Sequence, residues 1–354
     1  MANPLVSICI PTRNRARSLR ESLKSICAQT YSPLDILISD NASEDSTESV
    51  CRELAAADSR IRYVRHAANI GLHGNHNFCM DAARGEYFCI FHDHDNRDVR
   101  IVAEYVSFLE SHPGVGVVCS DWTLVDDSDS EIGVRDYPVE TVTPGLEYID
   151  RTIRSGRSSI GIPGAMVRRA ALGAIRFDKD APIGFGDFPV WFELAERADV
   201  GHIAGRLWSW RQNAESHSAR TIESIANDYH ENLGKYCDAH LVRWPRHEER
   251  VRRWRRDIRR FLFWALAYEV ALHCQKATGR TPPPSSRSLF EIMDYRLTPQ
   301  QLDHALDQMK HYRGGAFEHL IFGLVSTLIR RGMTRPLGWI PRYRSIARTI
   351  LGLE

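Results

Sequence analysis

Short, mostly apolar runs alternate with amphipathic stretches over the first 95 residues of the chain. Runs of this kind are typical of strands that are buried on both faces of a sheet. Stretches with helical spacing lie between them, as in Leu19, Leu23 and Ile26. The pattern predicts the order βαβαβαβ, and therefore an α/β fold with a mostly parallel sheet flanked by helices. The predicted strands are 6–11, 34–39, 61–64 and 87–91.

Polar clusters directly follow three of these predicted strands. The clusters are 12–15, 40–43 and 92–95. Because the carboxyl ends of parallel strands lie at one edge of a sheet, and ligands of such folds bind there, we expect the three clusters to converge on one crevice.

The pattern changes along the rest of the chain. Strands are predicted next at 115–120 and 160–168, with a solvated loop or hairpin at 121–137 between them. A helix is predicted at 188–198. Beyond about Ser218 the strand signals fade and helical patterns replace them. The predicted helices there are 222–239, 246–275, 299–311 and 317–330. We therefore expect two domains, an α/β domain at 1–218 and a mainly α-helical region at 219–354.

Charge is unevenly distributed along the chain, although the formal net charge is only +1. Residues 1–241 hold 25 Lys and Arg against 35 Asp and Glu, a net charge of −10. Residues 242–354 hold 21 against 10, a net charge of +11. An acidic first part suits a site that uses a metal ion, and a basic second part suits an anionic partner.

The composition is that of a folded soluble protein, with 43% hydrophobic and 26% charged residues. The first residues lack the basic stretch and long apolar run of a secretory signal, which predicts a cytoplasmic location. The eight cysteines occur singly, without a CxxC pair, so we expect buried, reduced thiols.

The segment His92-Asp93-His94-Asp95 closes the fourth predicted strand. Two carboxylates beside a buried strand are costly unless a cation or hydrogen-bond donors compensate them. Oxygen ligands two residues apart suit a hard divalent ion, Mg2+ or Mn2+, that also holds phosphate oxygens. Two alternatives remain open on spacing alone. The segment can be an exposed turn followed by a helix-capping Asp98, or His92 and His94 can bind zinc, although no third ligand has the expected spacing.

Six segments occur in an order and at approximate spacings that resemble one known family. Over residues 5–218 the chain is similar to the family 2 glycosyltransferases of the GT-A fold. The resemblance implies a nucleotide-diphospho-sugar transferase fold and an inverting, metal-dependent transfer of a sugar. The segments are VSICIPTRNR (6–15), LDILISDNASEDST (34–47), NIGLHGNHNF (69–78), ARGEYFCIFHDHD (83–95), PGAMVRRAAL (163–172), and GDFPVWFELAERADV (186–200) before LWSWR (207–211).

The resemblance also assigns residues to the donor site. Those that match the loop lining the nucleotide pocket are Pro11, Thr12 and Asn14. Asp40 matches the acidic residue that hydrogen-bonds the base or ribose, with capping of a turn as its alternative. Asn69 and Asn77 match a stretch that contributes polar contacts near the donor, with hydrogen bonding within the loop as the alternative.

The metal and catalytic residues are implied in the same way. Asp93 and Asp95 match the Asp-x-Asp element that bridges the donor diphosphate through Mn2+ or Mg2+, so Asp93 is counted among the donor-binding residues too. Asp187 matches the general base that takes the proton from the acceptor hydroxyl, with the N-cap of the following helix as the alternative.

The chain departs from the family pattern at two places. Gly186 stands where the family commonly has Glu, which leaves the acceptor contacts unassigned. The segment 211–213 reads Arg-Gln-Asn where the family often has Arg-x-His. His217, four residues further on, is the candidate that replaces this histidine at the metal or diphosphate, with a surface loop residue as the alternative.

The C-terminal region interleaves arginine with aromatic and apolar residues, as around Trp254, Phe261 and Trp264. Such a pattern can bind nucleic acid, anionic lipid or nothing specific. Its apolar stretch at 320–329 is shorter than the ~20 residues of a membrane-spanning helix. We expect no nucleic acid partner. Two alternatives remain, peripheral docking on the cytosolic face of a membrane and homo-oligomerisation.

Together these features predict transfer of a sugar from a nucleotide-diphosphate sugar, with UDP-sugars favoured, to a hydroxyl of a glycan or lipid-linked acceptor in bacterial surface polysaccharide synthesis. The alternatives are a nucleotidyltransferase that acts on sugar phosphates and an inactive scaffold that binds sugar nucleotides. The former usually has a Gly-rich loop after the first strand, and 11–14 contains no glycine. The absence of GxGxxG after an early strand disfavours a dehydrogenase.

Overall fold

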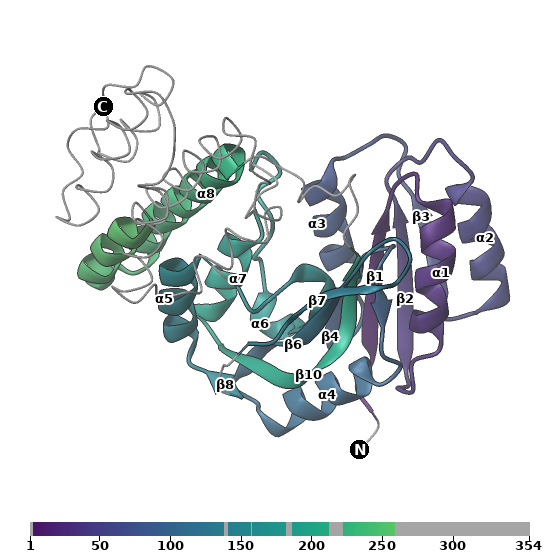
Figure 1. The fold of residues 1–354 in the computed structure, drawn as a ribbon, viewed down its shortest axis with the longest axis horizontal. Helices are drawn as coiled ribbons and strands as arrows, with labels where there is room; N and C mark the ends of the chain where they lie inside the picture. Colours follow the sequence, from purple (N-terminus) through teal and green to yellow (C-terminus); the bar gives the residue numbers. More distant parts are fainter. Residues whose placement is uncertain (1–2, 138–140, 157, 182–185, 212–221, 259–354) are drawn as a thin grey trace, which may run out of the picture. The chain divides into compact units, whose positions relative to one another are not determined.

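The computed structural model describes residues 3–137, 141–156, 158–181, 186–211 and 222–258 (Figure 1). Within these ranges ten strands form one sheet in the order β3-β2-β1-β4-β9-β6-β10-β5, with β7 beside β6 and β8 beside β10. The strands are β1 (Val6–Thr12), β2 (Leu34–Asp40), β3 (Ile61–Arg65), β4 (Tyr87–Ile90), β5 (Asn96–Arg97), β6 (Val115–Val125), β7 (Glu131–Arg135), β8 (Val142–Thr143), β9 (Ala165–Arg168) and β10 (Asp199–Arg211).

The main strands run in one direction, apart from β9. β1 is parallel to β2 and to β4, β2 is parallel to β3, and β6 is parallel to β10. β9 is antiparallel to both of its neighbours, β4 and β6, so β6 points the same way as β4. The predicted fold class, a mostly parallel sheet flanked by helices, is confirmed. The reversed strand β9 in its middle is an addition to that prediction.

Amphipathic helices pack against the sheet, and in Figure 1 α1 and α2 lie together beside β1, β2 and β3. α1 buries Leu19, Leu23 and Ile26, as their spacing predicts. α4 is an additional helix, and it buries Ile101 and Tyr105 one turn apart. The helices of this part are α1 (Ala16–Cys27), α2 (Thr47–Ala57), α3 (Leu72–Ala82), α4 (Ile101–Ser111), α5 (Gly145–Ser155), η1 (Ile162–Gly164), α6 (Arg169–Leu172) and α7 (Phe188–Ala195).

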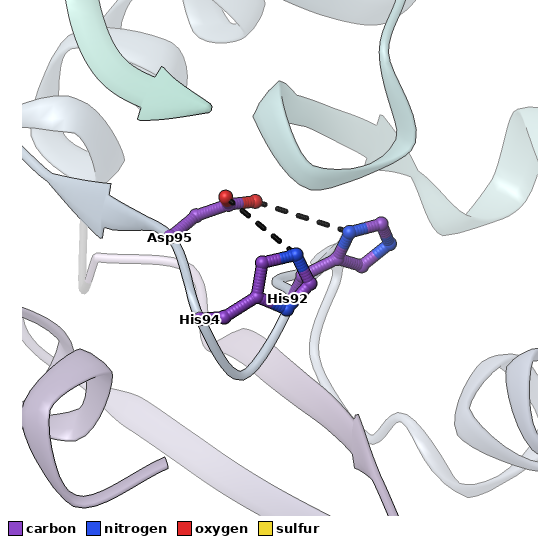
Figure 2. Close-up of side chains that lie close together, drawn as sticks. All are labelled: His92, His94 and Asp95. Carbon is purple, nitrogen blue, oxygen red and sulfur yellow. Dashed lines mark ion pairs between the residues drawn. The ribbon is translucent and has the colours of Figure 1, made fainter. Parts of the chain in front are cut away.

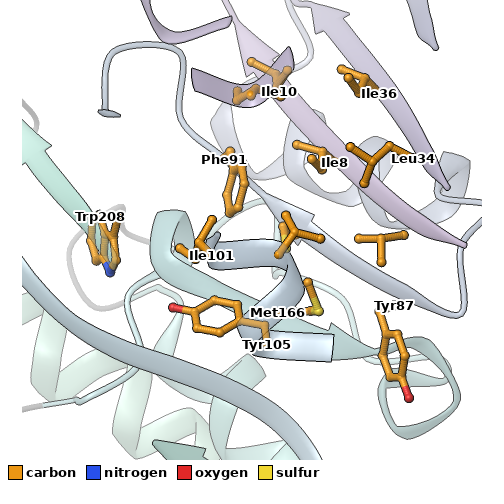
Figure 3. Packing of buried hydrophobic residues seen from close by; sticks show 14 of the residues in the cluster. Ile8, Ile10, Leu34, Ile36, Tyr87, Phe91, Ile101, Tyr105, Met166 and Trp208 are labelled. Carbon is orange, nitrogen blue, oxygen red and sulfur yellow. The ribbon is translucent and has the colours of Figure 1, made fainter. Parts of the chain in front are cut away.

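The hydrophobic core joins strands and helices that are distant in the sequence (Figure 3). Ile8, Ile36 and Met166, from three different strands, are fully buried. The buried hydroxyl of Tyr105 also has partners, because it donates to the carbonyl of Gly164 and lies 2.8 Å from Ser120 Oγ. A packed core of this kind holds the carboxyl ends of the strands in fixed positions, as a preorganised site requires.

The cysteines of the described residues are free thiols, as predicted. Six are buried and Cys27 is half-buried, whereas Cys274 lies outside the described residues. Burial raises the pKa of Cys119 to about 12, which keeps this thiol protonated at neutral pH.

Three predicted elements have different bounds in the structure. The strand predicted at 160–168 is reduced to β9, because a 3₁₀ turn forms around Pro163, which has no N–H for a strand ladder. The segment 121–137 is a hairpin, in which β6 continues to Val125 and pairs with β7, so the solvated-loop alternative is wrong. The helix predicted at 188–198 ends at Ala195, and β10 begins soon after it.

The described residues divide into two compact units, 3–150 with 158–211, and 151–156 with 222–258. In the second unit α8 (Ile222–Arg243) is followed by η2 (Pro245–His247) and a helical segment at 248–258. None of the helices in the described part of the chain combines the length and apolarity needed to cross a membrane.

Most of the basic region lies outside the described residues, including the helices predicted at 299–311 and 317–330. The domain boundary at 218, the membrane docking and the homo-oligomerisation therefore stay predictions.

Candidate active site

The loops that follow β1 and β2 are joined by hydrogen bonds at the carboxyl edge of the sheet. The backbone N–H of Asn14 donates to Ser43 Oγ at 2.9 Å, and Asn14 Oδ1 accepts from the backbone N–H of Glu44 at 2.7 Å. Asn14 has a φ of 52°, a left-handed conformation that asparagine adopts more readily than most residues. The backbone N–H of Asn41 also donates to the carbonyl of Thr12 at 2.9 Å. The predicted convergence of these two loops is present.

Asp40 is fully buried at the end of β2. Its Oδ1 accepts from the backbone N–H of Ser43 at 2.9 Å, and its Oδ2 accepts from the hydroxyl of Tyr63 at 2.8 Å. Burial and this hydrogen bond raise the pKa of Tyr63. Oδ1 of Asp40 therefore holds the turn, as the capping alternative states, and Oδ2 binds Tyr63 on β3. The predicted contact with the donor has to use a remaining lone pair of this buried carboxylate.

A third polar segment, before α3, is joined through Asn41 to the loops that follow β1 and β2. We call these three joined segments the rim. The amide of Asn41 donates to Asn69 Oδ1 at 2.8 Å and accepts from the backbone N–H of Ile70 at 2.8 Å. Asn69 is exposed, and its Oδ1 also accepts from the backbone N–H of Gly71 at 2.9 Å. Asn41 was not among the predicted site residues, although its place directly after Asp40 is a signal for this role.

Asn77 does not join this rim. It is buried in α3, where its Oδ1 accepts from the backbone N–H of Phe177 at 2.8 Å and its Nδ2 donates to the carbonyl of Phe177 at 2.9 Å. These paired bonds fasten the segment at Phe177 to α3. Hydrogen bonding within the structure therefore describes Asn77 better than the predicted donor contact.

Three side chains of the loop after β4 come together (Figure 2). One ligand atom from each of His92, His94 and Asp95 lies within 4.8 Å of the other two. His92 Nδ1 is 3.9 Å from Asp95 Oδ2, and His94 Nε2 is 3.9 Å from Asp95 Oδ1. Asp95 thus offers the third potential ligand that the zinc alternative lacked, because the loop brings this carboxylate close to both rings.

Asp95 is a fully buried carboxylate with one oxygen that lacks a hydrogen bond. Its Oδ1 accepts from the backbone N–H of Arg211 at 3.0 Å, whereas its Oδ2 has no hydrogen-bond partner among the described residues. The buried guanidinium of Arg97 lies 3.9 Å from Oδ2, at the distance of an ion pair. Burial raises the pKa of Asp95, although the nearby charges of His94 and Arg97 oppose the shift. Such an oxygen is costly unless a cation compensates it. Asp95 and the two imidazoles therefore fit a divalent metal ion, and the exposed-turn alternative is wrong for Asp95.

Arg97 holds the backbone of this loop, and it was not among the site residues predicted from the sequence. Its side chain is fully buried and lies 4.2 Å from the centre of the Phe91 ring. The guanidinium donates to the carbonyls of Asp95 and His92 at 2.8 and 3.3 Å. Burial lowers the pKa of Arg97 to about 10, so the group is still protonated at neutral pH. Its position two residues after Asp95 is the signal in the sequence that points to this role.

Arg211 ties the last strand to the same loop. Besides the backbone bond to Asp95, its Nε donates to the carbonyl of His94 at 3.1 Å and its Nη1 to the carbonyl of Asp126 at 2.9 Å. It is the arginine at the Arg-x-His position, where the sequence drew attention only to the missing histidine. His217, the predicted replacement, lies outside the described residues.

Asp93 has different surroundings from Asp95, although both belong to the Asp-x-Asp element. Asp93 Oδ2 accepts from the hydroxyl of Thr12 at 2.5 Å, and Asp93 Oδ1 lies 2.9 Å from His94 Nδ1. Thr12 and Pro11 are buried at the end of β1. The structure therefore brings Thr12 and Asp93 together, and it turns the carboxylate of Asp93 toward Thr12 and His94.

Asp187 lies on another element, at the N-terminal end of α7. It stands at the N-cap position without a capping bond from its side chain, so the capping alternative is not supported. Instead, its Oδ2 accepts from Trp191 Nε1 at 3.1 Å. Although the residue is partly exposed, burial of its carboxyl group raises the pKa of Asp187 to about 6, against the opposing effect of the Trp191 hydrogen bond. A pKa near neutrality suits a general base.

Comparison with known proteins identifies the part of the chain that carries this site. Residues 7–175 match the sequence profile described as Glycosyl transferase family 2. The matched range includes β1 to β4, the rim residues and the loop 92–95. Asp187 and Arg211 lie beyond it.

Two curated relatives are similar to shorter stretches of the chain. A putative glycosyltransferase of Bacillus subtilis, EpsE, is 32% identical over 135 residues, which cover 38% of this chain and 47% of the relative. The GalNAc(5)-diNAcBac-PP-undecaprenol beta-1,3-glucosyltransferase of Campylobacter jejuni is 38% identical over 93 residues, which cover 26% of this chain and 30% of the relative. The chain therefore matches less than half of the length of either protein.

Among solved structures, that of S. aureus TarS 1–349 in complex with UDP-GlcNAc resembles this protein with a TM-score of 0.53 at 17% identity. The likeness covers 67% of this chain and 66% of that one. A likeness at this level of identity shows that the two proteins share a fold, and nothing further.

Proposed function

Because residues 7–175 of this chain form a family 2 glycosyltransferase domain, we propose that the protein is an inverting enzyme that moves a sugar from a nucleotide-diphosphate donor to a hydroxyl group of its acceptor. The observation that carries this proposal is the buried carboxylate of Asp95, which lies with His92 and His94 after β4. A donor diphosphate at this edge of the sheet needs a cation, and these residues have the chemistry to hold one.

The rim of polar side chains suits the nucleotide half of the donor. Asn14 and Asn69 are exposed, and each belongs to a loop that hydrogen bonds hold in place. Amide groups can hydrogen-bond the base and ribose without adding negative charge near the phosphates. Pro11 and Asp40 shape the floor of the same pocket in this proposal, and UDP-sugars are the favoured donors.

The diphosphate half lies at the loop 92–95 in this proposal, with Asp95, His92 and His94 as the residues that hold Mn2+ or Mg2+. When bound, such an ion stabilises the negative charge that develops on the departing nucleoside diphosphate. Arg97 and Arg211 keep the loop in the required conformation through their bonds to its backbone carbonyls.

Asp187 takes the proton from the acceptor hydroxyl. As the hydroxyl oxygen forms its bond to the anomeric carbon, the bond from that carbon to the diphosphate breaks on the opposite face, and the configuration inverts. The proton ends on the carboxylate of Asp187, and the electron pair of the broken bond ends on the diphosphate. Trp191 holds one carboxylate oxygen and so orients the base.

The acceptor in this proposal is a glycan or a lipid-linked glycan used in bacterial surface polysaccharide synthesis. The Campylobacter jejuni relative supports it, since that enzyme is named for a glycan on undecaprenyl diphosphate. The proposal does not distinguish one linkage from another.

The rate of transfer is expected to depend on pH through Asp187. The base works only when it is deprotonated, and the pKa of Asp187 is raised to about 6. We therefore expect kcat/KM to be constant above about pH 7 and to fall about tenfold per pH unit below about pH 5.5. A profile measured from pH 5 to 9 at saturating Mn2+ checks this. The residual turnover of Asp187→Asn is expected to lack this fall at low pH. A wild-type profile that is flat down to pH 5 contradicts the assignment of Asp187 as the base.

The proposed function itself is tested by a panel of nucleotide sugars in thermal unfolding, with and without Mn2+. A ligand that binds only the folded protein stabilises it by about 2.7 kcal/mol at 100 times its Kd. We expect a rise in Tm for one class of nucleotide, larger when Mn2+ is present. The donor so found is then incubated with glycan acceptors, and release of nucleoside diphosphate is measured. No stabilisation by any nucleotide sugar contradicts the proposal.

A further inference from the structure

His94 lies between the two aspartates of the Asp-x-Asp element. Its Nδ1 is 2.9 Å from Asp93 Oδ1, and its Nε2 is 3.9 Å from Asp95 Oδ1. An ionised carboxylate can only accept a hydrogen bond, so Nδ1 carries the proton in this contact. In a neutral imidazole the lone pair is then on Nε2, which is the nitrogen on the side of Asp95. This is the arrangement in which a carboxylate sets the tautomer of a metal-binding histidine.

The spacing of the other donor atoms also suits one ion. His92 Nδ1 and His94 Nε2 each lie 3.9 Å from an oxygen of Asp95, which is too long for a hydrogen bond. Ligands at about 2.0–2.2 Å from a shared ion lie roughly 3–3.5 Å from each other. Each of these two distances, one to Oδ2 and one to Oδ1, has to close by about half an ångström to reach that spacing. The donor atoms of the three residues lie within 4.8 Å of one another, so the widest pair has to close by up to about 1.5 Å. Asp95 Oδ2, fully buried and without a hydrogen-bond partner among the described residues, is the atom that gains most.

Asp93, by contrast, already has a partner for each of its oxygens. Oδ2 accepts from Thr12 at 2.5 Å and Oδ1 faces His94. Thr12 belongs to β1, which pairs directly with β4, so the core of the sheet positions this hydroxyl. Each oxygen keeps a further lone pair, but turning the carboxylate toward an ion disturbs both contacts, whereas leaving it in place supports His94.

We propose that the ion of this site is bound by His92, His94 and Asp95, and that Asp93, held by Thr12, is a positioning residue that orients His94. This inference rests on the proposed function for the presence of a metal ion, and it divides the Asp-x-Asp element into one ligand and one supporting residue. The two imidazoles make the site nitrogen-rich.

The consequence is a preference among metals. Imidazole favours Co2+, Ni2+ and Zn2+ over Mn2+, whereas Mg2+ prefers sites made of oxygen. We expect Co2+ alone to bind at least about tenfold more tightly than Mn2+, and Mg2+ to bind more weakly than either. A site built from the two carboxylates alone follows the same order of Mn2+ and Co2+ with a smaller spread.

The test is a titration of the full-length protein with Co2+ followed by its visible spectrum, and with Mn2+ followed by pulsed EPR. Modulation from imidazole nitrogen is expected on bound Mn2+ in the wild type and in Asp93→Asn, and not in the double variant His92→Gln with His94→Gln. Asp93→Asn is expected to lower Co2+ affinity about 10–100-fold, as loss of a supporting residue does. Asp95→Asn is expected to lower the Co2+ affinity further. The control is His112→Gln, which changes a histidine at the end of α4 and is expected to leave the Co2+ affinity unchanged.

Absence of nitrogen modulation on wild-type Mn2+ overturns the proposal without the use of any variant. An Asp93→Asn protein that loses metal as completely as Asp95→Asn, while the histidine variants bind normally, overturns it too, because the two carboxylates are then the ligands. Failure of the wild type to bind Co2+ at millimolar concentration also overturns the proposal. None of these titrations contains a sugar nucleotide, so their outcome is separate from that of the donor panel.

Discussion

Replacing Asp187 with asparagine is expected to lower kcat by about 10²–10⁴-fold, the usual contribution of a positioned base. Asparagine has nearly the same shape, and its amide oxygen can still accept from Trp191 Nε1, so α7 keeps its conformation. Because the base acts on the acceptor, the affinity for the donor is expected to stay within about twofold. The measurements are steady-state turnover and donor binding by calorimetry.

The matched control for this variant is Asp136→Asn, in an exposed aspartate paired with Arg206. It removes a carboxylate of the same size, and we expect wild-type turnover. Turnover by Asp187→Asn at the wild-type rate removes Asp187 from the mechanism, and another acid must then take the proton. A loss of donor affinity as large as the loss of kcat indicates a structural role instead.

Replacing Asp95 with asparagine is expected to abolish the metal-dependent part of donor binding. The loss in metal affinity should exceed about 100-fold, because removal of a supporting residue alone costs about 10–100-fold. The fold is expected to survive, since the amide oxygen still accepts from the backbone N–H of Arg211 and the cost of burying a charge is removed. Donor binding in the presence and absence of Mn2+, and Tm of the metal-free protein, check both parts.

For Asp95 the control is Asp81→Asn, an exposed carboxylate on α3 that pairs with Arg176. Its donor binding should match the wild type. If Asp95→Asn still binds the donor more tightly with Mn2+ than without, the ion lies elsewhere. If its metal-free Tm falls sharply, Asp95 is a structural residue, and the account of its buried oxygen is wrong.

Much of the fold was readable from the apolar pattern, because strands covered on both faces have few sequences available to them. The runs at 6–11, 34–39 and 87–91 became β1, β2 and β4 nearly unchanged. The parallel order predicted that their following loops converge, and the bonds of Thr12 to Asp93 and of Asn14 to Ser43 confirm it. α4 was not predicted, although Ile101 and Tyr105 have helical spacing.

Other elements depend on partners that lie far away in the sequence. β9 runs between β4 and β6 against their direction, and its short length follows from the turn around Pro163. No local pattern specifies which neighbours such a strand has. The same holds for Arg211, whose role arises because β10 ends beside the loop after β4.

The sequence by itself determined the fold class, the family and the edge of the sheet where the chemistry gathers, since these follow from periodicity and from the order of motifs. Only the tertiary structure decided which side chains of 92–95 face each other. A loop can direct neighbouring side chains in several ways, and here the hydroxyl of Thr12 on β1 and the backbone of Arg211 on β10 select one of them. Spacing makes Asp93 and Asp95 look equivalent, whereas contacts from distant strands give them different surroundings.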